Sequence, residues 1–97
     1  MEKFEDGLNT AVFTTKYVVK DKKEITYVTH EMEDGAWQFF SNDDFDKFED
    51  VAMIVSLDEL IQIDRSVLDI AQLPLGYIAT RQSVNDKWKF FKKEEEN

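Results

Sequence analysis

The stretch "VAMIVSLDELIQID", residues 51–64, determines the class of fold because it joins a strand pattern directly to a helix pattern. "VAMIV" at 51–55 has no polar alternate residue, so we interpret it as a strand covered on both faces. In the following residues, Ser56 and Glu59 form a capping box ahead of an apolar stripe, which predicts a helix starting near Leu57. A strand followed at once by an amphipathic helix favours a domain that combines sheet and helix.

Alternating apolar and polar residues predict further strands on the N-terminal side. "AVFTTKYVVK" at 11–20 is rich in β-branched and aromatic residues, and "EITYVTH" at 24–30 resumes the alternation after a polar turn. We expect these two segments to pair as a hairpin. Asp34 and Gly35 then turn the chain, since glycine accepts a positive φ, before a third strand "AWQFF" at 36–40.

The C-terminal third predicts a short helix and a second hairpin. "RSVLDIAQL" at 65–73 has the pattern of a helix capped near Ser66 and ended by Pro74. "YIATRQ" at 77–82 and "KWKFFK" at 87–92 are strand candidates around a "SVND" turn.

The motifs "WQFF" at 37–40 and "WKFF" at 88–91 resemble each other, and each is expected to be the second arm of a hairpin. Because side chains alternate along a strand, the tryptophan and the first phenylalanine of each motif share one face. The second phenylalanine of each motif points to the other face.

The segment "SNDDFDKFED" at 41–50 is dominated by acids, with five Asp or Glu residues beside one lysine. Phe45 and Phe48 stand at i, i+3, which predicts one or two helical turns after a cap at Ser41 or Asn42. We expect both phenylalanines to anchor the segment in the core, so that Phe45→Ala costs roughly 3 kcal/mol or more.

The length and composition suit one globular domain. A chain of 97 residues with 42% hydrophobic residues has enough apolar surface for one core but not for two. We predict a single α+β domain over residues 1–97, with its core at about 11–91 and a frayed tail at 92–97. The expected architecture is an antiparallel sheet of about five or six strands with one main helix and one or two short helices packed on it.

The negative charge is concentrated in the middle of the chain. Residues 31–64 contain eleven acids and one lysine, which gives 1 − 11 = −10, whereas the whole chain carries −9. Such a field repels nucleic acid phosphates and attracts basic partners. The same charge also serves solubility, and both interpretations remain open.

Several kinds of site are disfavoured. The chain has no cysteine and only three scattered glycines, so thiolate zinc sites, thiol nucleophiles and phosphate-binding loops are not expected. Asn42, Asp44 and Asp46 have the 1, 3, 5 spacing of a calcium loop, but Lys47 and Met53 occupy positions that require Gly and Glu. We therefore predict no metal and no cofactor.

Catalysis and membrane insertion also lack a sequence signal. His30 is the only histidine, and no "GxSxG" motif is present, so a hydrolase using His30 with a carboxylate is the weakest hypothesis. The longest apolar run, at 51–55, is too short to span a bilayer, and the N-terminus lacks an apolar signal region. We expect a cytoplasmic protein that is not an enzyme and has no membrane partner.

Four linked stretches resemble a known family. "GAWQFFSNDD", "VSLDELIQID", "RSVLDIAQLPLGYIATR" and the closing Trp88 are similar to a bacterial family catalogued as domain of unknown function 2185, described as immunity-protein-33-like. The resemblance covers Ala11 to Trp88. Asn42 stands where the family has glycine, and because Asn tolerates a positive φ the turn can be kept.

The resemblance implies a protein that inhibits a bacterial toxin by binding it, and a basic toxin would suit the acidic middle of the chain. The lysines around Trp88 argue against strong pairing of an edge strand, so a monomer or weak dimer is expected. The alternative is a small regulatory domain that binds a metabolite in an aromatic-lined cleft involving Trp37 or Trp88. The candidate residues for partner binding are Asp43, Asp44, Asp46, Glu49 and Asp50.

Overall fold

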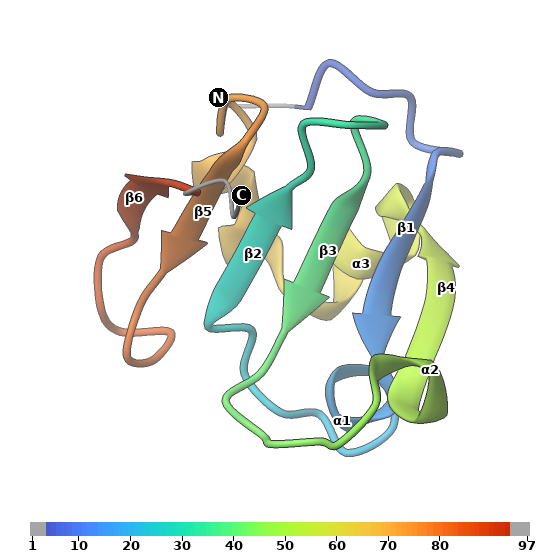
Figure 1. Cartoon of the computed structure of the whole chain (residues 1–97). Helices are drawn as coiled ribbons and strands as arrows, with labels where there is room; N and C mark the ends of the chain where they lie inside the picture. The colour runs from blue at the N-terminus through green and yellow to red at the C-terminus, as the bar shows by residue number, and fades with distance from the viewer. Residues whose placement is uncertain (1–3, 94–97) are drawn as a thin grey trace.

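The computed structural model describes residues 4–93 as one six-stranded sheet with short helices. The single α+β domain predicted from the sequence is confirmed (Figure 1). In chain order the elements are β1 (Ala11–Thr15), α1 (Lys16–Val19), β2 (Tyr27–His30), β3 (Trp37–Phe40), α2 (Phe48–Val51), β4 (Ala52–Ser56), α3 (Leu57–Ile63), the 3-10 helix η1 (Arg65–Ile70), β5 (Tyr77–Thr80) and β6 (Lys89–Lys92).

The strands lie in the order β4-β1-β3-β2-β5-β6. All neighbouring pairs are antiparallel except β1 and β3, which are parallel. The predicted hairpins β2–β3 and β5–β6 are both present, and Gly35 in the first of them has a φ of +72°. The two edges of the sheet are therefore β4 and β6.

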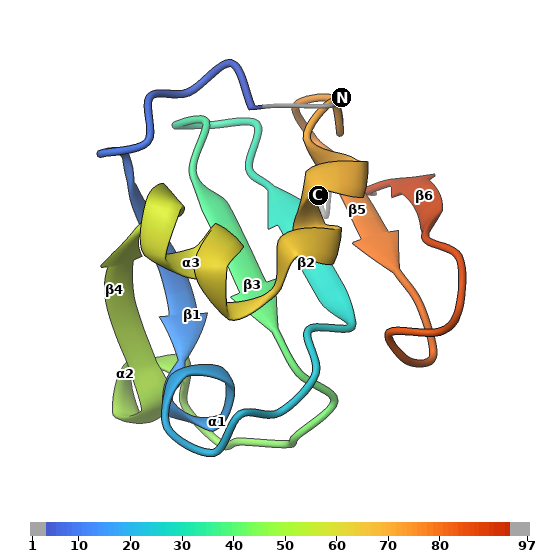
Figure 2. The same ribbon diagram turned by 180° about the vertical axis from the view of Figure 1, so that it is seen from behind.

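The helices α3 and η1 cover one face of the sheet (Figure 2). Val28 of β2 stands opposite Phe39 of β3 and Ala79 of β5, and all three side chains are fully buried under this helical layer. The helices contribute Leu57, Leu60, Ile61, Val67 and Ile70 to the same cluster. Burying these apolar side chains is the main source of stability for the domain.

The predicted start of the main helix is confirmed. Ser56 is the N-cap of α3, and its Oγ accepts a hydrogen bond of 3.1 Å from the backbone N–H of Glu59. The predicted second helix is shorter than expected, because η1 ends at Ile70.

The prediction of one strand over residues 11–20 is wrong. β1 ends at Thr15, whose hydroxyl caps α1 by accepting a hydrogen bond from the N–H of Val18. The predicted hairpin between residues 11–20 and 24–30 is also wrong, since β1 pairs with β3 and β4 and not with β2. Val18 is buried in the single helical turn of α1, which follows β1 directly. A sequence pattern this short does not distinguish such a turn from the continuation of a strand.

The strand predicted at 51–55 is present as β4 (Ala52–Ser56), but the prediction that it is covered on both faces is wrong. β4 is an edge strand, and Ile54 is 64% exposed on the face away from α3. Only Val55 in this strand is buried. Val51 is buried too, but it belongs to α2.

The segment 41–50 departs from its predicted helix. α2 begins only at Phe48, after Lys47 as N-cap, so Phe45 lies in irregular chain. Asn42 does not have a positive φ, because Lys22 is the one non-glycine residue with that conformation in residues 4–93. The turn after β3 therefore does not depend on glycine-like freedom at Asn42.

The two ends of the described chain refine the predicted boundaries. Phe4 is buried against Trp37, with ring centroids 4.9 Å apart, so the core cluster includes a residue ahead of the predicted range 11–91. β6 ends at Lys92, and residues 94–97 of the predicted tail lie outside the described residues. No helix within residues 4–93 is long and apolar enough to cross a membrane.

Candidate functional site

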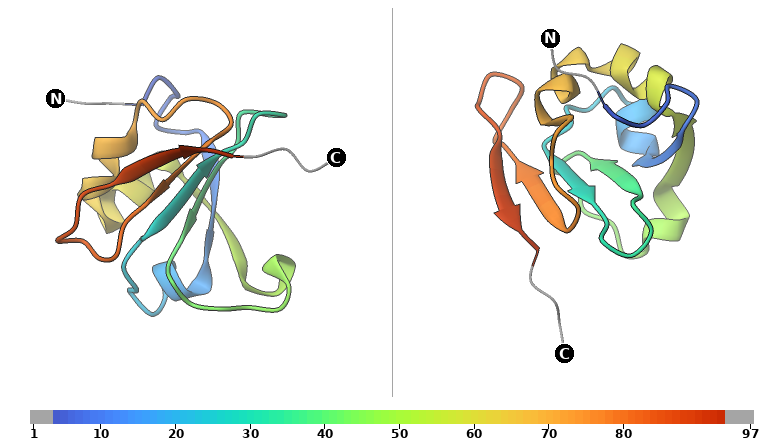
Figure 3. Two further views of the ribbon diagram at one scale, coloured as in Figure 1. Left: turned by 60° about the vertical axis from the view of Figure 1, so that its left-hand side comes forward. Right: turned by 90° about the horizontal axis from the view of Figure 1, so that it is seen from above.

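Within residues 4–93, no helical layer covers the face of the sheet opposite α3 and η1 (Figure 1; Figure 3). The strand registers define which side chains share this open face, because directly paired residues point to the same side. One row crosses all six strands in spatial order: Ile54, Phe13, Gln38, Thr29, Ile78 and Phe91. A second, shorter row contains Phe40, Tyr27, Thr80 and Lys89.

Aromatic side chains of the segment 41–50 pack onto one end of the open face. The ring of Phe48 lies 6.3 Å from Phe13 and 5.3 Å from Phe40, and the ring of Phe45 lies 6.1 Å from Phe40. Tyr27 continues the cluster on the other side of Phe40 at 5.9 Å. We refer to these five aromatic residues as the open-face cluster.

This placement corrects the expectation that Phe45 and Phe48 anchor the segment in the core. Both side chains are half-buried, and neither belongs to the core cluster between the sheet and α3. They hold the segment against the open face instead. The sequence spacing correctly indicated that the two phenylalanines act together, since their rings are 6.0 Å apart.

The five acids that the sequence singled out lie on this segment beside the open-face cluster. Four of them are exposed, whereas Asp43 is half-buried and its Oδ1 accepts a hydrogen bond of 2.6 Å from the Ser41 hydroxyl. None of the five forms an ion pair with a residue in the range 4–93. The structure thus brings them together as one exposed acidic segment: Asp43, Asp44, Asp46, Glu49 and Asp50.

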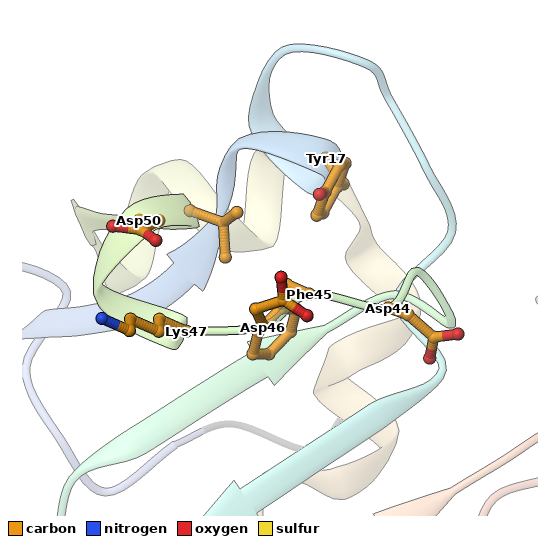
Figure 4. A pocket seen from close by; sticks show the side chains of 7 residues that line it. Tyr17, Asp44, Phe45, Asp46, Lys47 and Asp50 are labelled. Carbon is orange, nitrogen blue, oxygen red and sulfur yellow. The ribbon is translucent and has the colours of Figure 1, made fainter.

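The acidic segment has a hollow on each side of Phe45. One, of about 370 Å³, is lined by Tyr17, Val51 and residues 44–47 together with Asp50 (Figure 4). In Figure 4, Asp44 and Asp50 stand at opposite ends of this hollow, with Asp46 between them. The other hollow, of about 430 Å³, lies between residues 41–45 and the ends of β2 and β5.

Neither tryptophan of the predicted ligand cleft lines either hollow. Trp37 is 2% exposed, stacks on the ring of His30 at 3.8 Å and donates from Nε1 to Oδ1 of Asp6 at 3.1 Å. These contacts give Trp37 a structural role in the core.

Trp88 belongs to a different environment from Trp37. It is half-buried, and the guanidinium of Arg81 lies over its ring at 4.0 Å. Trp37 opens β3 beside His30, whereas Trp88 precedes the end of β6 that pairs with Thr80, so the two indoles lie at opposite ends of the strands.

Arg81 is a residue that the sequence analysis missed. Its side chain is 2% exposed, pairs with Asp64 at 3.0 Å and donates from Nε to the carbonyl of Ile25 at 2.9 Å. Asp64 also accepts from the backbone N–H and hydroxyl of Ser66 at the start of η1. The sequence does not indicate that Arg81 pairs with Asp64, because the two residues are 17 positions apart and no local pattern links them.

Within residues 4–93, no carboxylate is hydrogen-bonded to His30, so the hypothesis that His30 acts in catalysis with a carboxylate gains no support. Its Nδ1 lies 2.7 Å from the carbonyl of Leu73, and its ring is stacked on Trp37. Among residues 4–93, no three His, Cys, Asp or Glu side chains are grouped so that they could hold a metal ion.

The fold and this surface define a class: a small α+β domain with a one-sided helical layer and an open sheet face bordered by acids. The family model of the immunity protein Imm33 domain matches residues 12–92, so the chain belongs to the Imm33 immunity protein family. This agrees with the resemblance noted in the sequence. Comparison with curated proteins and with solved structures finds no match.

Proposed function

We propose that this protein is a bacterial immunity protein that neutralises a cognate toxin in the cytoplasm by binding it. The observation that carries the proposal is the Imm33 family match over residues 12–92. A binder needs a surface and not a reacting group, and the exposed acidic segment supplies one that favours a basic partner.

The proposed inhibition is stoichiometric and non-enzymatic. In support of this, the one histidine is held between a backbone carbonyl and Trp37. A metabolite-binding cleft at Trp37 or Trp88 has less support, because neither residue lines either of the two hollows described above.

The test is co-expression with the toxin encoded beside this chain's own gene. We expect the chain to restore growth of cells that produce this toxin, and an unrelated toxin of similar charge serves as the control. Mixing the purified proteins should titrate toxin activity to zero at a fixed molar ratio, with the mass of the toxin unchanged. Inhibition by a small catalytic amount, or a change in the mass of the toxin, would show that the chain is an enzyme. Absence of rescue would contradict the immunity function.

A further inference from the structure

We propose that the open face of the sheet is the docking surface for the toxin, and that the acidic segment forms its charged border. The occupant is a basic protein with an apolar patch flanked by Lys or Arg. This inference rests on the proposed immunity function and names the surface that would perform it.

The open face carries large exposed apolar side chains at positions where a solvent-facing sheet is normally polar. An antiparallel sheet with one covered face usually alternates apolar residues inside and polar residues outside. Here the outward positions include Ile54, Tyr27 and Phe91, which are 64%, 37% and 53% exposed. Ile54 and Phe91 lie on the two edge strands, and Phe13 and Ile78 stand next to them in the same row, whose centre is polar at Gln38 and Thr29. Large exposed apolar patches of this kind mark interaction sites.

The charge beside this face indicates the chemistry of the occupant. The segment 41–50 carries five acids and one lysine, which gives 1 − 5 = −4. Phe45 and Phe48 of the same segment pack into the open-face cluster, so the exposed carboxylates stand at the border of the apolar surface. A partner seated on the face would bring its own border against these acids, and a basic border is complementary to them.

The opposite edge of the face sets the orientation of the partner. On β6, exposed Lys89 lies on the open face, whereas Lys92 pairs with Tyr77 on the other face, and Lys93 just beyond the strand pairs with Glu31 at 3.1 Å. The face is thus acidic beside β3 and β4 and basic at β6. The basic side of the toxin should lie over the segment 41–50.

A second copy of this chain is a less suitable occupant. Each copy carries −9, so two copies repel each other over most of their surfaces. Self-association through the open face is nevertheless a distinct outcome of the experiment below.

The two parts of the surface should affect binding in different ways. Charges at the border of an interface mainly change the association rate and its salt dependence, whereas apolar residues at its centre mainly change the dissociation rate. Substitutions in the two parts can therefore be distinguished by kinetics.

Phe90 and Phe91 provide a matched pair of substitutions. They are neighbours on β6 and are 45% and 53% exposed, but Phe91 pairs with Ile78 on the open face and Phe90 pairs with Ala79 on the other face. Phe91→Thr and Phe90→Thr therefore remove similar exposed area from opposite sides of one strand. Ile54→Thr tests the other edge of the face.

The experiment measures binding of full-length variants to the toxin that the wild-type chain neutralises, by surface plasmon resonance at low and moderate salt. We expect Phe91→Thr and Ile54→Thr each to weaken binding about tenfold through faster dissociation, and Phe90→Thr to change it less than about threefold. Circular dichroism and thermal unfolding verify that each variant is folded. A variant with the five acids changed to Asn or Gln should associate more slowly and lose much of the salt dependence.

Four outcomes would overturn the proposal. If wild-type rescue is present but both open-face variants bind like the wild type, the docking surface is elsewhere and the immunity function stands. If Phe90→Thr weakens binding as much as Phe91→Thr, the effect does not belong to the open face. If the free chain is a dimer that Ile54→Thr or Phe91→Thr dissociates without loss of toxin binding, the face is an interface between copies. Absence of any toxin complex with the wild type contradicts both this inference and the immunity function.

Discussion

At the scale of single residues, Arg81 shows how a buried charge is accommodated in this small domain. Its guanidinium has an anionic partner in Asp64, a carbonyl acceptor in Ile25 and the face of Trp88 beside it. A buried ion is tolerated only when it is paired and hydrogen-bonded in this way.

We predict that Arg81→Leu lowers the free energy of unfolding by about 3 kcal/mol, because Asp64 and the Ile25 carbonyl lose their partner. Urea denaturation measures the effect. Arg65→Leu is the matched control, since Arg65 is exposed, and it should change stability by less than about 0.5 kcal/mol. Equal losses from the two variants would show that the pair with Asp64 contributes nothing specific.

Two phenylalanines separate the core from the open-face cluster. Phe39 is fully buried under the helices, whereas Phe45 is half-buried on the open side. We predict that Phe39→Ala lowers the free energy of unfolding by about 4 kcal/mol and Phe45→Ala by only about 1–2 kcal/mol. The difference arises because folding removes less apolar surface of Phe45 than of Phe39 from contact with water. The second value replaces the larger cost expected from sequence. Thermal unfolding of both variants checks the difference, and a Phe45→Ala loss equal to that of Phe39→Ala would place Phe45 in the core.

At the scale of elements, the carboxylate of Asp86 is one of two that hold the turn of the hairpin β5–β6, the other being Glu24, which accepts from the N–H of Val84. Asp86 accepts hydrogen bonds from the backbone N–H groups of Gln82 and Lys87, at 3.1 and 3.0 Å. These bonds, that from Gln82 first, lower the pKa of Asp86 from its usual 3.8.

The sign of the pH effect follows from the lowered pKa. A carboxyl group whose pKa is lower in the folded state than in the unfolded state stabilises the fold at pH values above its unfolded-state pKa. This stabilisation is lost as the pH falls through the folded-state pKa. We therefore predict that the turn stays intact down to about pH 3.8 and loosens below it, where Asp86 becomes protonated. The amide resonances of Gln82 and Lys87 report the transition by NMR. In Asp86→Asn this titration should be absent, and a midpoint at or above 3.8 would contradict the prediction.

The elements also show how far local pattern reaches. The capping box at Ser56 and the turn at Gly35 correctly predicted the start of α3 and the hairpin β2–β3. The four-residue helix α1 was missed, because a single helical turn with one buried residue, Val18, matches a strand pattern as well.

At the scale of the whole molecule, the concentrated charge should make stability depend on salt. Changing the five acids of the segment 41–50 to Asn or Gln alters the net charge from −9 to −9 + 5 = −4. We predict that the variant is at least as stable as the wild type at low salt, because self-repulsion falls and four of the five acids are exposed. Added salt should stabilise the wild type more than the variant.

Urea denaturation at low and high sodium chloride measures both effects. A control that changes exposed Asp21 and Asp69 to Asn, away from the segment, should show a smaller reduction of the salt dependence. A loss of stability in the five-acid variant would mean that these carboxylates support the fold and do not only border the open face.

The candidate site was predicted in part. The acidic segment is visible as composition, and the pairing of Phe45 with Phe48 is visible as spacing. The open-face cluster was not foreseen, because Phe13, Tyr27 and Phe40 come from three strands that only the sheet order brings together.

The sequence by itself determined the α+β class, the family, the strand and helix that meet at Ser56, and which side chains of a strand share a face. These properties depend on contacts between residues near one another in the chain and on side-chain alternation. Only the tertiary structure decided that β1 lies between β3 and β4, that β4 is an edge, and that one sheet face is left uncovered. Alternation separates two faces of a strand but does not tell which of them the helices bury, since that depends on how α3 and η1 pack on distant strands.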